Sequence, residues 1–160
     1  LEDAAEAVGS KYLDKSCGTF GEIGIFSFNG NKIITSGGGG ALISDDTALI
    51  QRAKHLSTQA REDLPYYHHL EIGYNFKMNN LAASIGLAQL EQLDSFIRKR
   101  RAINANYRSL LKDFVGISFQ TEGKESKSNG LCLPSSVNLS FQDQEMIVEI
   151  MHEELSKTFK

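Results

Sequence analysis

The sequence of 160 residues contains no tryptophan, only two prolines and only two cysteines. Cys17 and Cys132 lie far apart, with no CxxC pattern and no histidine at metal-ligand spacing, so reduced thiols in the cytosol are expected. No apolar run approaches the ~20 residues that span a bilayer. The N-terminal stretch also lacks the basic start and apolar core of a signal peptide. These absences predict a cytoplasmic protein without a membrane anchor.

The charge of the chain argues against nucleic acid and anionic membranes as partners. A formal net charge of -3 and a pI near 5.8 give no general attraction to nucleic acid or to an anionic membrane. The basic run Arg98–Arg101 lies within a helical pattern, which favours a solvated helix face. The apolar fraction of 41% and the charged fraction of 23% are typical of a soluble globular protein. Both ends fall within motif-like or helical sequence, so we expect a portion of a longer chain.

The first 56 residues alternate short apolar runs with turn residues, which predicts several short elements. One of these elements is a tight turn at Asn29–Asn31, which is predicted because Asn and Gly tolerate positive φ. The expected elements are a short helix over residues 2–9, a strand over Gly21–Phe28, a tight turn at Asn29–Asn31, a strand over Ala41–Ser44 and a helix over Ala48–Leu56 begun by Asp45 or Asp46.

The remainder of the sequence predicts one long loop and more helix. Ser57–Met78 has no clean periodicity, and a loop of this length in a compact chain is usually functional. Short strands mixed with helices indicate an α/β fold. The expected later elements are a long helix capped by Asn79 or Asn80 and running to about Asp113, a strand and loop over Gly116–Asn129, a strand at Val137–Leu139 and a last helix capped by Ser140.

Three local features could carry chemistry, and each has a plainer alternative. Asp3 could be an active-site carboxylate after a strand or simply a helix N-cap. Lys32, flanked by Ile33 and Ile34, could be an amine made nucleophilic by apolar surroundings. The local sequence favours the plainer alternative, in which its stem lies on apolar surface with its head in water. The run Gly37–Gly40 could let backbone amides approach a phosphate, or could mark a close crossing or flexible turn.

Metal and serine-hydrolase chemistry have no support in the sequence. His68 and His69 are adjacent and would point to opposite faces of an extended chain, so they are poor joint metal ligands. Ser27, Ser36 and Ser57 lack the GxSxG context of a nucleophile elbow.

Three ordered blocks resemble the DegT/DnrJ/EryC1/StrS family of pyridoxal-phosphate-dependent sugar aminotransferases. The blocks are Glu2–Ser10, Gly18–Lys32 and Gly73–Ala83, the last continuing through Gly86–Leu90. The resemblance implies the large cofactor-binding domain of a fold-type I aminotransferase, with a mixed sheet flanked by helices. It covers roughly residues 1–112, so we predict the C-terminal part of the large domain there and the start of a small C-terminal domain at 113–160. Relatives tend to carry a Trp soon after Asn129, where this chain has none.

The resemblance implies specific roles for residues of the first two blocks. Lys32 would carry pyridoxal 5′-phosphate as a Schiff base and, once released, move a proton between substrate and cofactor. Asp3, 29 residues earlier (32 − 3), would pair with the pyridinium nitrogen. Ser27 would hydrogen-bond the cofactor phosphate. Glu6 occupies a position where many relatives have Gln or His beside the cofactor ring, and either this role or a helix-surface role is open.

The third block implies a site shared between two subunits. Asn75 and Lys77 match positions that, in the family, reach the phosphate of the neighbouring subunit's cofactor, which implies a homodimer. Lys77 stands where the family usually has Arg, and lysine keeps the charge without the bidentate fork. Tyr67 and His69 lie in the preceding loop, which is near the substrate in relatives.

The segment Asn29–Thr35 with its all-glycine 37–40 run resembles the bacillosamine-type branch that makes 4-amino-4,6-dideoxy sugar nucleotides. The implied reaction is transfer of an amino group, from glutamate, to C4 of a UDP-4-keto-6-deoxy-N-acetylhexosamine, for glycan biosynthesis. One alternative is a truncated, inactive paralogue that dimerises through the helix predicted from residue 79. The other is a related sugar 3-dehydratase, but those enzymes replace the lysine with His. The 160 residues alone are expected to show little turnover.

Overall fold

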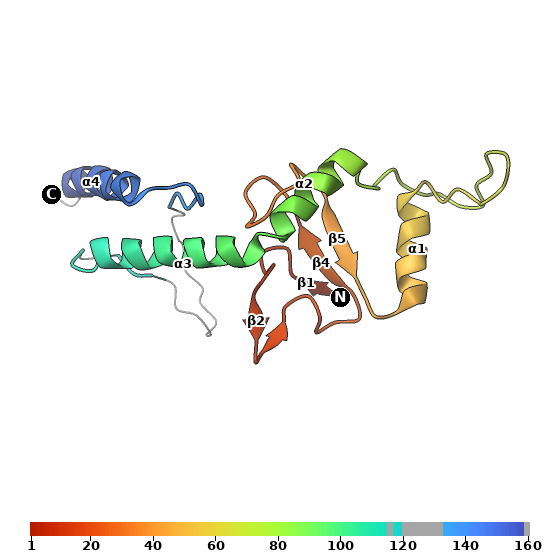
Figure 1. The fold of residues 1–160 in the computed structure, drawn as a ribbon, viewed down its shortest axis with the longest axis horizontal. Coiled ribbons are helices and arrows are strands. Elements are labelled where there is room, and N and C mark those ends of the chain that lie inside the picture. Colours follow the sequence, from red (N-terminus) through yellow and green to blue (C-terminus); the bar gives the residue numbers. More distant parts are fainter. Residues whose placement is uncertain (115–116, 120–132, 159–160) are drawn as a thin grey trace. The chain divides into compact units, whose positions relative to one another are not determined.

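The computed structural model describes residues 1–114, 117–119 and 133–158, with side chains described to residue 154. It divides into two compact units, the N-terminal unit (Leu1–Asp94) and the C-terminal unit (Ser95–Lys160). The predicted boundary at residue 112 concerns the domains of a longer enzyme and stays a prediction. The elements in chain order are β1 Glu2–Asp3, β2 Lys11–Tyr12, β3 Lys15–Ser16, β4 Gly24–Ser27, β5 Gly40–Ile43, α1 Thr47–Ser57, α2 Asn80–Leu90, α3 Leu93–Leu110 and α4 Phe141–Thr158 (Figure 1).

The N-terminal unit is built around a mixed sheet with strand order β1-β4-β5. β1 pairs parallel with β4, and Asp3 lies opposite Ile25. β5 pairs antiparallel with β4, and Ser27 lies opposite Gly40. The predicted α/β fold is confirmed, as are the two predicted strands, which form β4 and β5 within narrower or slightly shifted bounds.

The helix predicted over residues 2–9 is wrong. The N–H groups of Glu2 and Ala4 donate to the carbonyls of Ile23 and Ile25, at 2.8 and 3.0 Å, and so make a strand. The chain then turns through bonds from Ala7 N to Ala4 O and from Ser10 N to Ala7 O, both 2.9 Å. The local alanine content favoured a helix, but pairing with β4 overrides such weak propensity.

The segment between β4 and β5 folds back on itself. The predicted turn is confirmed by a bond of 3.1 Å from Lys32 N to Asn29 O. The positive φ angles of this segment belong to Gly37 (81°) and Gly39 (78°), whereas the prediction placed them in the turn. Phe28 closes the segment, since its N–H donates to Gly39 O and its carbonyl accepts from Ser36 N, both at 3.0 Å.

Helices α1 and α2 begin where the sequence predicted. The Asp46 carboxylate accepts from Ala48 N at 2.8 Å, and the Asn79 side chain accepts from Ala82 N at 2.8 Å. The single long helix predicted after Asn79 is wrong, because α2 ends at Leu90 and α3 begins at Leu93. At the break, Gln92 N donates to Gln89 O at 3.0 Å, an i to i−3 bond that interrupts the α-helical ladder.

The C-terminal unit packs α3 against α4. The buried apolar residues in the described part of this unit form one cluster, which consists of Ile103, Tyr107, Leu111 and Val148. Ser140 caps α4 as predicted, with its hydroxyl accepting from Asp143 N at 3.1 Å. The strand predicted at Val137–Leu139 is wrong, because Leu139 N bonds to Ser136 O at 2.9 Å in a turn. Most of the strand and loop predicted over Gly116–Asn129 lies outside the described residues, as do Asn129 and Cys132, and residues 117–119 form no strand.

Across the stretches that the structure describes, no helix combines the length and the apolar character that crossing a membrane requires.

Candidate active site

The ends of β1 and β4 bring the predicted cofactor residues to one edge of the sheet. Because the two strands are parallel, both end at the same edge, where ligands of α/β sheets commonly bind. Asp3 lies opposite Ile25, and Ser27 is two residues further along β4. Side chains two apart on a strand share a face, so Asp3 and Ser27 lie on the same face of the sheet.

Asp3 is exposed, and its Oδ1 accepts from Ala5 N at 3.1 Å. This local bond is typical of an Asx turn, in which the carboxylate caps the chain as it leaves the strand. No helix follows, so the alternative of a helix N-cap is wrong. The second oxygen of the carboxylate is at the exposed strand end, where it could accept a bond from a cation or a protonated ring nitrogen.

Lys32 reaches the same edge from the turn that follows β4. Its ammonium forms an ion pair with the Glu6 carboxylate, which belongs to the turn after β1. The Lys32 side chain is 12% exposed, whereas that of Glu6 is 79% exposed. Ile34, two residues on, is 2% exposed and anchors the segment in the interior. The Lys32 side chain is therefore largely buried, and its ammonium pairs with the turn that directly follows Asp3.

The glycine run after Lys32 combines close crossings with open space. A Cβ at Gly40 would lie 2.3 Å from Phe26 O, and one at Gly39 would lie 2.8 Å from Met78 Cε. A Cβ at Gly37 or Gly38 would meet nothing within 4 Å. The close-crossing interpretation is therefore correct for Gly40, where the backbone of Phe26 lies opposite, and the approach of a phosphate to the first half of the run stays a prediction.

Glu2 is a site-building residue that the sequence interpretation missed. Its Oε1 accepts from Gly18 N at 2.6 Å, and its Oε2 accepts from Phe20 N at 2.7 Å and Gly21 N at 3.3 Å. The bond from Gly18, followed by the other two, lowers the pKa of the Glu2 carboxyl below its usual value. Glu2 thus binds the 18–21 turn to the face of β1 opposite Asp3. Neither Glu2 nor the glycine-containing 18–21 turn forms a local sequence pattern that would have predicted these bonds.

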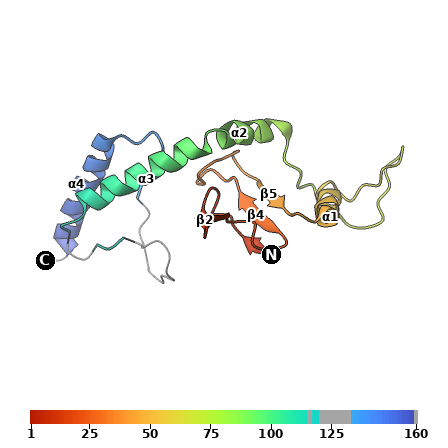
Figure 2. The same ribbon diagram turned by 60° about the horizontal axis from the view of Figure 1, so that its bottom comes forward.

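The other four predicted residues lie in the 57–78 loop, which extends away from the sheet beyond α1 (Figures 1 and 2). Tyr67 is 78% exposed, and the Arg61 guanidinium lies 4.3 Å from its ring centroid. His69 Nδ1 lies 2.9 Å from Gln59 O. Asn75 bridges to Thr58, and Lys77 N donates to Ser57 O at 3.1 Å. No contact between these four residues and Lys32 is present in the described chain.

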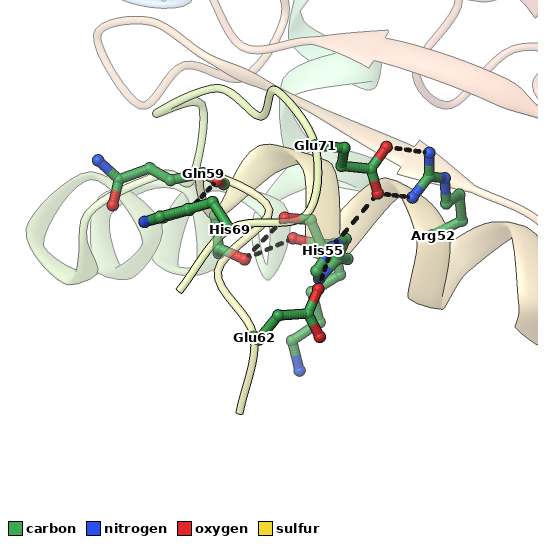
Figure 3. Close-up of polar contacts among 8 residues, drawn as sticks. Arg52, His55, Gln59, Glu62, His69 and Glu71 are labelled. Atoms are coloured by element: carbon green, nitrogen blue, oxygen red, sulfur yellow. Dashed lines mark hydrogen bonds and ion pairs between the residues drawn. The ribbon is translucent and has the colours of Figure 1, made fainter. Parts of the chain in front are cut away.

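A polar network holds this loop against α1 (Figure 3). Arg52 pairs with both carboxylate oxygens of Glu71, with Nη2 to Oε2 at 2.6 Å. His55 Nε2 lies 3.5 Å from Glu71 Oε1 and 3.7 Å from Glu62 Oε1. The hydrogen bonds from Arg52 lower the pKa of Glu71, and those to Glu71 raise the pKa of Arg52. The sequence interpretation missed all four residues, because their spacing gives no motif.

Among the described residues, no group of three or more His, Cys, Asp or Glu side chains could hold a metal ion.

A lysine, a carboxylate and a hydroxyl thus lie near one sheet edge of an α/β fold, a set of groups found in enzymes that hold a cofactor on a lysine. The chain belongs to the DegT/DnrJ/EryC1/StrS aminotransferase family, which matches residues 1–158. The family match therefore also includes residues 113–158, which lie beyond the motif blocks. Members of this family use pyridoxal 5′-phosphate.

Similar proteins include two enzymes named for nucleotide sugars and one named only as a pyridoxal-phosphate-dependent aminotransferase. The chain is 50% identical to the aminotransferase-family protein EpsN of Bacillus subtilis over 81% of this chain and 33% of that protein. It is 46% identical to GDP-perosamine synthase of Escherichia coli O157:H7 over 79% of this chain and 34% of that enzyme. It is 35% identical to UDP-4-amino-4,6-dideoxy-N-acetyl-beta-L-altrosamine transaminase of Campylobacter jejuni over 67% of this chain and 30% of that enzyme.

A solved structure supports the fold. The sugar aminotransferase Spr1654 of Streptococcus pneumoniae, solved in its PLP form, superposes with a TM-score of 0.63 at 27% identity, over 69% of this chain and 30% of that one. The chain thus spans about a third of the length of the relatives it matches.

Proposed function

We propose that the protein carrying this sequence transfers an amino group to the keto carbon of a nucleotide-linked sugar, with pyridoxal 5′-phosphate held on Lys32. The observation that carries the proposal is the largely buried Lys32 side chain, which pairs with Glu6 near the sheet edge that also carries Asp3 and Ser27. Membership of a sugar aminotransferase family supports the same activity.

The donor set at the sheet edge fits this cofactor. An amine is required for the aldehyde, an anion for the protonated ring nitrogen, and hydrogen-bond donors for the phosphate. Lys32, Asp3 and Ser27 supply these groups in that order. The Lys32 side chain is 12% exposed and pairs with Glu6, and the carboxylate of Asp3 is exposed at its strand end.

Each residue then has a distinct task. Pyridoxal phosphate, when bound, supplies an electron sink for the carbon that exchanges its proton. Asp3 keeps the ring nitrogen protonated by ion pairing, and Ser27 donates to the phosphate. The Lys32 Nζ, as a free amine, would accept a proton from one carbon and return it to another. The Glu6 carboxylate, when ionised, can only accept hydrogen bonds, so it would orient the Lys32 side chain at the site.

The second half of the site is proposed to come from a partner copy in a homodimer. Asn75 and Lys77 would contact the phosphate of the partner's cofactor, and Tyr67 and His69 would contact the sugar nucleotide. The exposure of Asn75 and Lys77 on a loop directed away from the sheet supports a task outside their own subunit. The Lys77 ammonium would act as a single point charge toward the phosphate.

The proposed substrate is a UDP-4-keto-6-deoxy-N-acetylhexosamine, aminated at C4 with glutamate as donor. The 35% identity to a transaminase named for a UDP-linked 4-amino sugar supports the UDP sugar. A GDP-linked keto sugar is the second candidate, because a GDP-perosamine synthase is 46% identical. The presence of Lys32 opposes a sugar 3-dehydratase, in which a His takes its place. An inactive paralogue remains the alternative if the cofactor does not bind.

The test uses the full-length protein mixed with pyridoxal phosphate. We expect a visible absorbance band from lysine-bound cofactor, and borohydride reduction should place the label on the peptide containing Lys32. Lys32→Ala should lose band and label, whereas Lys11→Ala, which changes an exposed lysine, should keep both. A missing band in the unsubstituted protein would favour the inactive paralogue. A panel of UDP- and GDP-linked keto sugars with glutamate then distinguishes the substrates.

A further inference from the structure

The 57–78 loop is fixed at its base by an unusually close backbone crossing. Ala60 is fully buried, and both Gln59 (φ 69°) and Ala60 (φ 48°) adopt the left-handed conformation that non-glycine residues avoid. A Cβ at Gly73 would lie 2.2 Å from Ala60 N, so only glycine permits the crossing. Gln59 N donates to Tyr74 O at 2.9 Å, and Tyr74 N donates to Leu56 O at 2.7 Å. Strain of this kind persists only where surrounding contacts enforce it.

The network on α1 supplies those contacts to both limbs of the loop. Arg52 and His55 are three residues apart and so lie on one face of α1. Glu62 belongs to the limb that leaves the helix, and Glu71 belongs to the limb that returns (Figure 3). A bidentate arginine–carboxylate pair fixes orientation as well as distance. The helix therefore sets where both limbs lie.

Residues between the two limbs carry the groups proposed to meet the substrate. His69 is fixed by a bridge between His69 and Arg61 and by its ring contact with Gln59 O. Tyr67 is covered on one face by Arg61. Both contacts involve Arg61 on one limb and a residue close to the other limb, so they require the two limbs to keep their alignment. Glu71, which binds Arg52, is two residues from His69 on the returning limb.

We propose that Arg52 and Glu71 are positioning residues that preform the 57–78 loop for binding the sugar nucleotide. This inference rests on the proposed function, because it assigns the loop to the substrate. Preforming a binding loop removes the cost of ordering it when the ligand arrives. Loss of the pair should therefore weaken substrate binding without disturbing the cofactor on Lys32.

The test compares Arg52→Gln and Glu71→Gln with Lys54→Gln in the full-length protein. Lys54 is an exposed cation on the same helix, and its ammonium has no ion pair among the described residues. Three quantities are measured: amide exchange at Gln59 and Tyr74, the affinity for UDP-N-acetylglucosamine as probe, and the absorbance of lysine-bound pyridoxal phosphate. We expect faster exchange and affinity lowered about fivefold in both pair variants, because exposed pairs contribute modestly. The band should stay unchanged, and Lys54→Gln should match the unsubstituted protein.

The charge-swapped double variant Arg52→Glu with Glu71→Arg should recover most of the affinity. Unchanged exchange in the single variants would overturn the inference, because the pair would not position the loop. Faster exchange with unchanged affinity, or a band lost together with affinity, would also overturn it. If the unsubstituted protein does not bind the probe, both the UDP-sugar assignment and this inference fail. A missing band with probe binding intact would instead contradict only the proposed function.

Discussion

The N-terminal and C-terminal units differ in the interactions that stabilise each of them internally. In the described part of the C-terminal unit, buried apolar side chains gather in one cluster between two helices. In the N-terminal unit the buried apolar residues are Ala4, Ile34 and Ala60, which form no such cluster. There the chain is fixed by strand pairing, by carboxylates that accept backbone bonds, and by glycine crossings. All eight proposed site residues lie in the N-terminal unit. The described apolar cluster and the proposed site residues therefore lie in different units.

Removing apolar volume from the C-terminal unit is the most damaging change that this comparison predicts. Ile103→Ala should lower the free energy of unfolding of this unit by about 2–5 kcal/mol, because Ile103 is 5% exposed within the cluster. Ile150→Ala is the matched control, since the same side chain is 55% exposed on α4. Urea unfolding measures both variants. At temperatures where the variant stays folded, the absorbance of lysine-bound cofactor should not change, and a parallel loss would contradict the separation.

The N-terminal unit should instead be sensitive to an added methyl group at a backbone crossing. Gly73→Ala should cost about 1–3 kcal/mol, because its Cβ would be forced against the backbone of Gln59 and Ala60. Gly30→Ala is the control, since its Cβ would meet nothing within 4 Å. Amide exchange at Gln59 and Tyr74, together with urea unfolding, reports the change. Equal behaviour of the two variants would show that the crossing is not tightly fixed.

Capping of α4 tests the C-terminal unit at a smaller scale. Ser140 and Asp143 form a reciprocal cap, in which Ser140 N donates to Asp143 Oδ2 at 3.0 Å and the Ser140 hydroxyl accepts from Asp143 N. Ser140→Ala should cost about 1 kcal/mol. Ser109→Ala, at an exposed position of α3, should be neutral or slightly stabilising. If thermal unfolding shifts equally in both, the cap contributes nothing beyond helix propensity.

Local signals in the sequence predicted elements whose determinants are local. Asp46, Asn79 and Ser140 cap their helices as expected, because a cap needs only a side chain and nearby amides. Residues 2–9 were misread because β1 exists through its partner β4, which is distant in sequence. The break after Leu90 carries no glycine or proline, so periodicity alone ran through it.

The candidate site also contains residues that the sequence predicted and contacts that it could not predict. Spacing within the family motif identified Lys32, Asp3 and Ser27, which parallel pairing then brings to one sheet edge. The Arg52–Glu71 pair and the amide contacts of Glu2 were not predictable, because they join residues 19, 16 and 18 positions apart with no recurring pattern. Contacts of that kind follow from the fold and not from local sequence.

The weakest expected effect concerns Glu2 of the N-terminal unit and depends on pH. Its pKa is lowered in the folded state by backbone bonds, chiefly that from Gly18 N, so the folded protein favours the charged form. The stabilisation is therefore fully present above the unfolded pKa and is lost as pH falls through the lowered folded value. Glu2→Gln should reduce stability at neutral pH and flatten the acid-dependent part of the curve, because the amide replaces one accepting oxygen.

The measurement is urea unfolding of the N-terminal unit between pH ~7 and pH ~3, followed at amides of the 18–21 turn. Glu22→Gln is the control. Among the described residues the Glu22 carboxylate accepts no hydrogen bond, and only its backbone carbonyl accepts one, from the Ser44 hydroxyl. The difference between Glu2→Gln and the unsubstituted protein should shrink as the pH falls, whereas Glu22→Gln should differ little at any pH. A difference that persisted at acid pH would mean that Glu2 acts through packing. The charged carboxylate would then not be what binds the turn to the strand that carries Asp3.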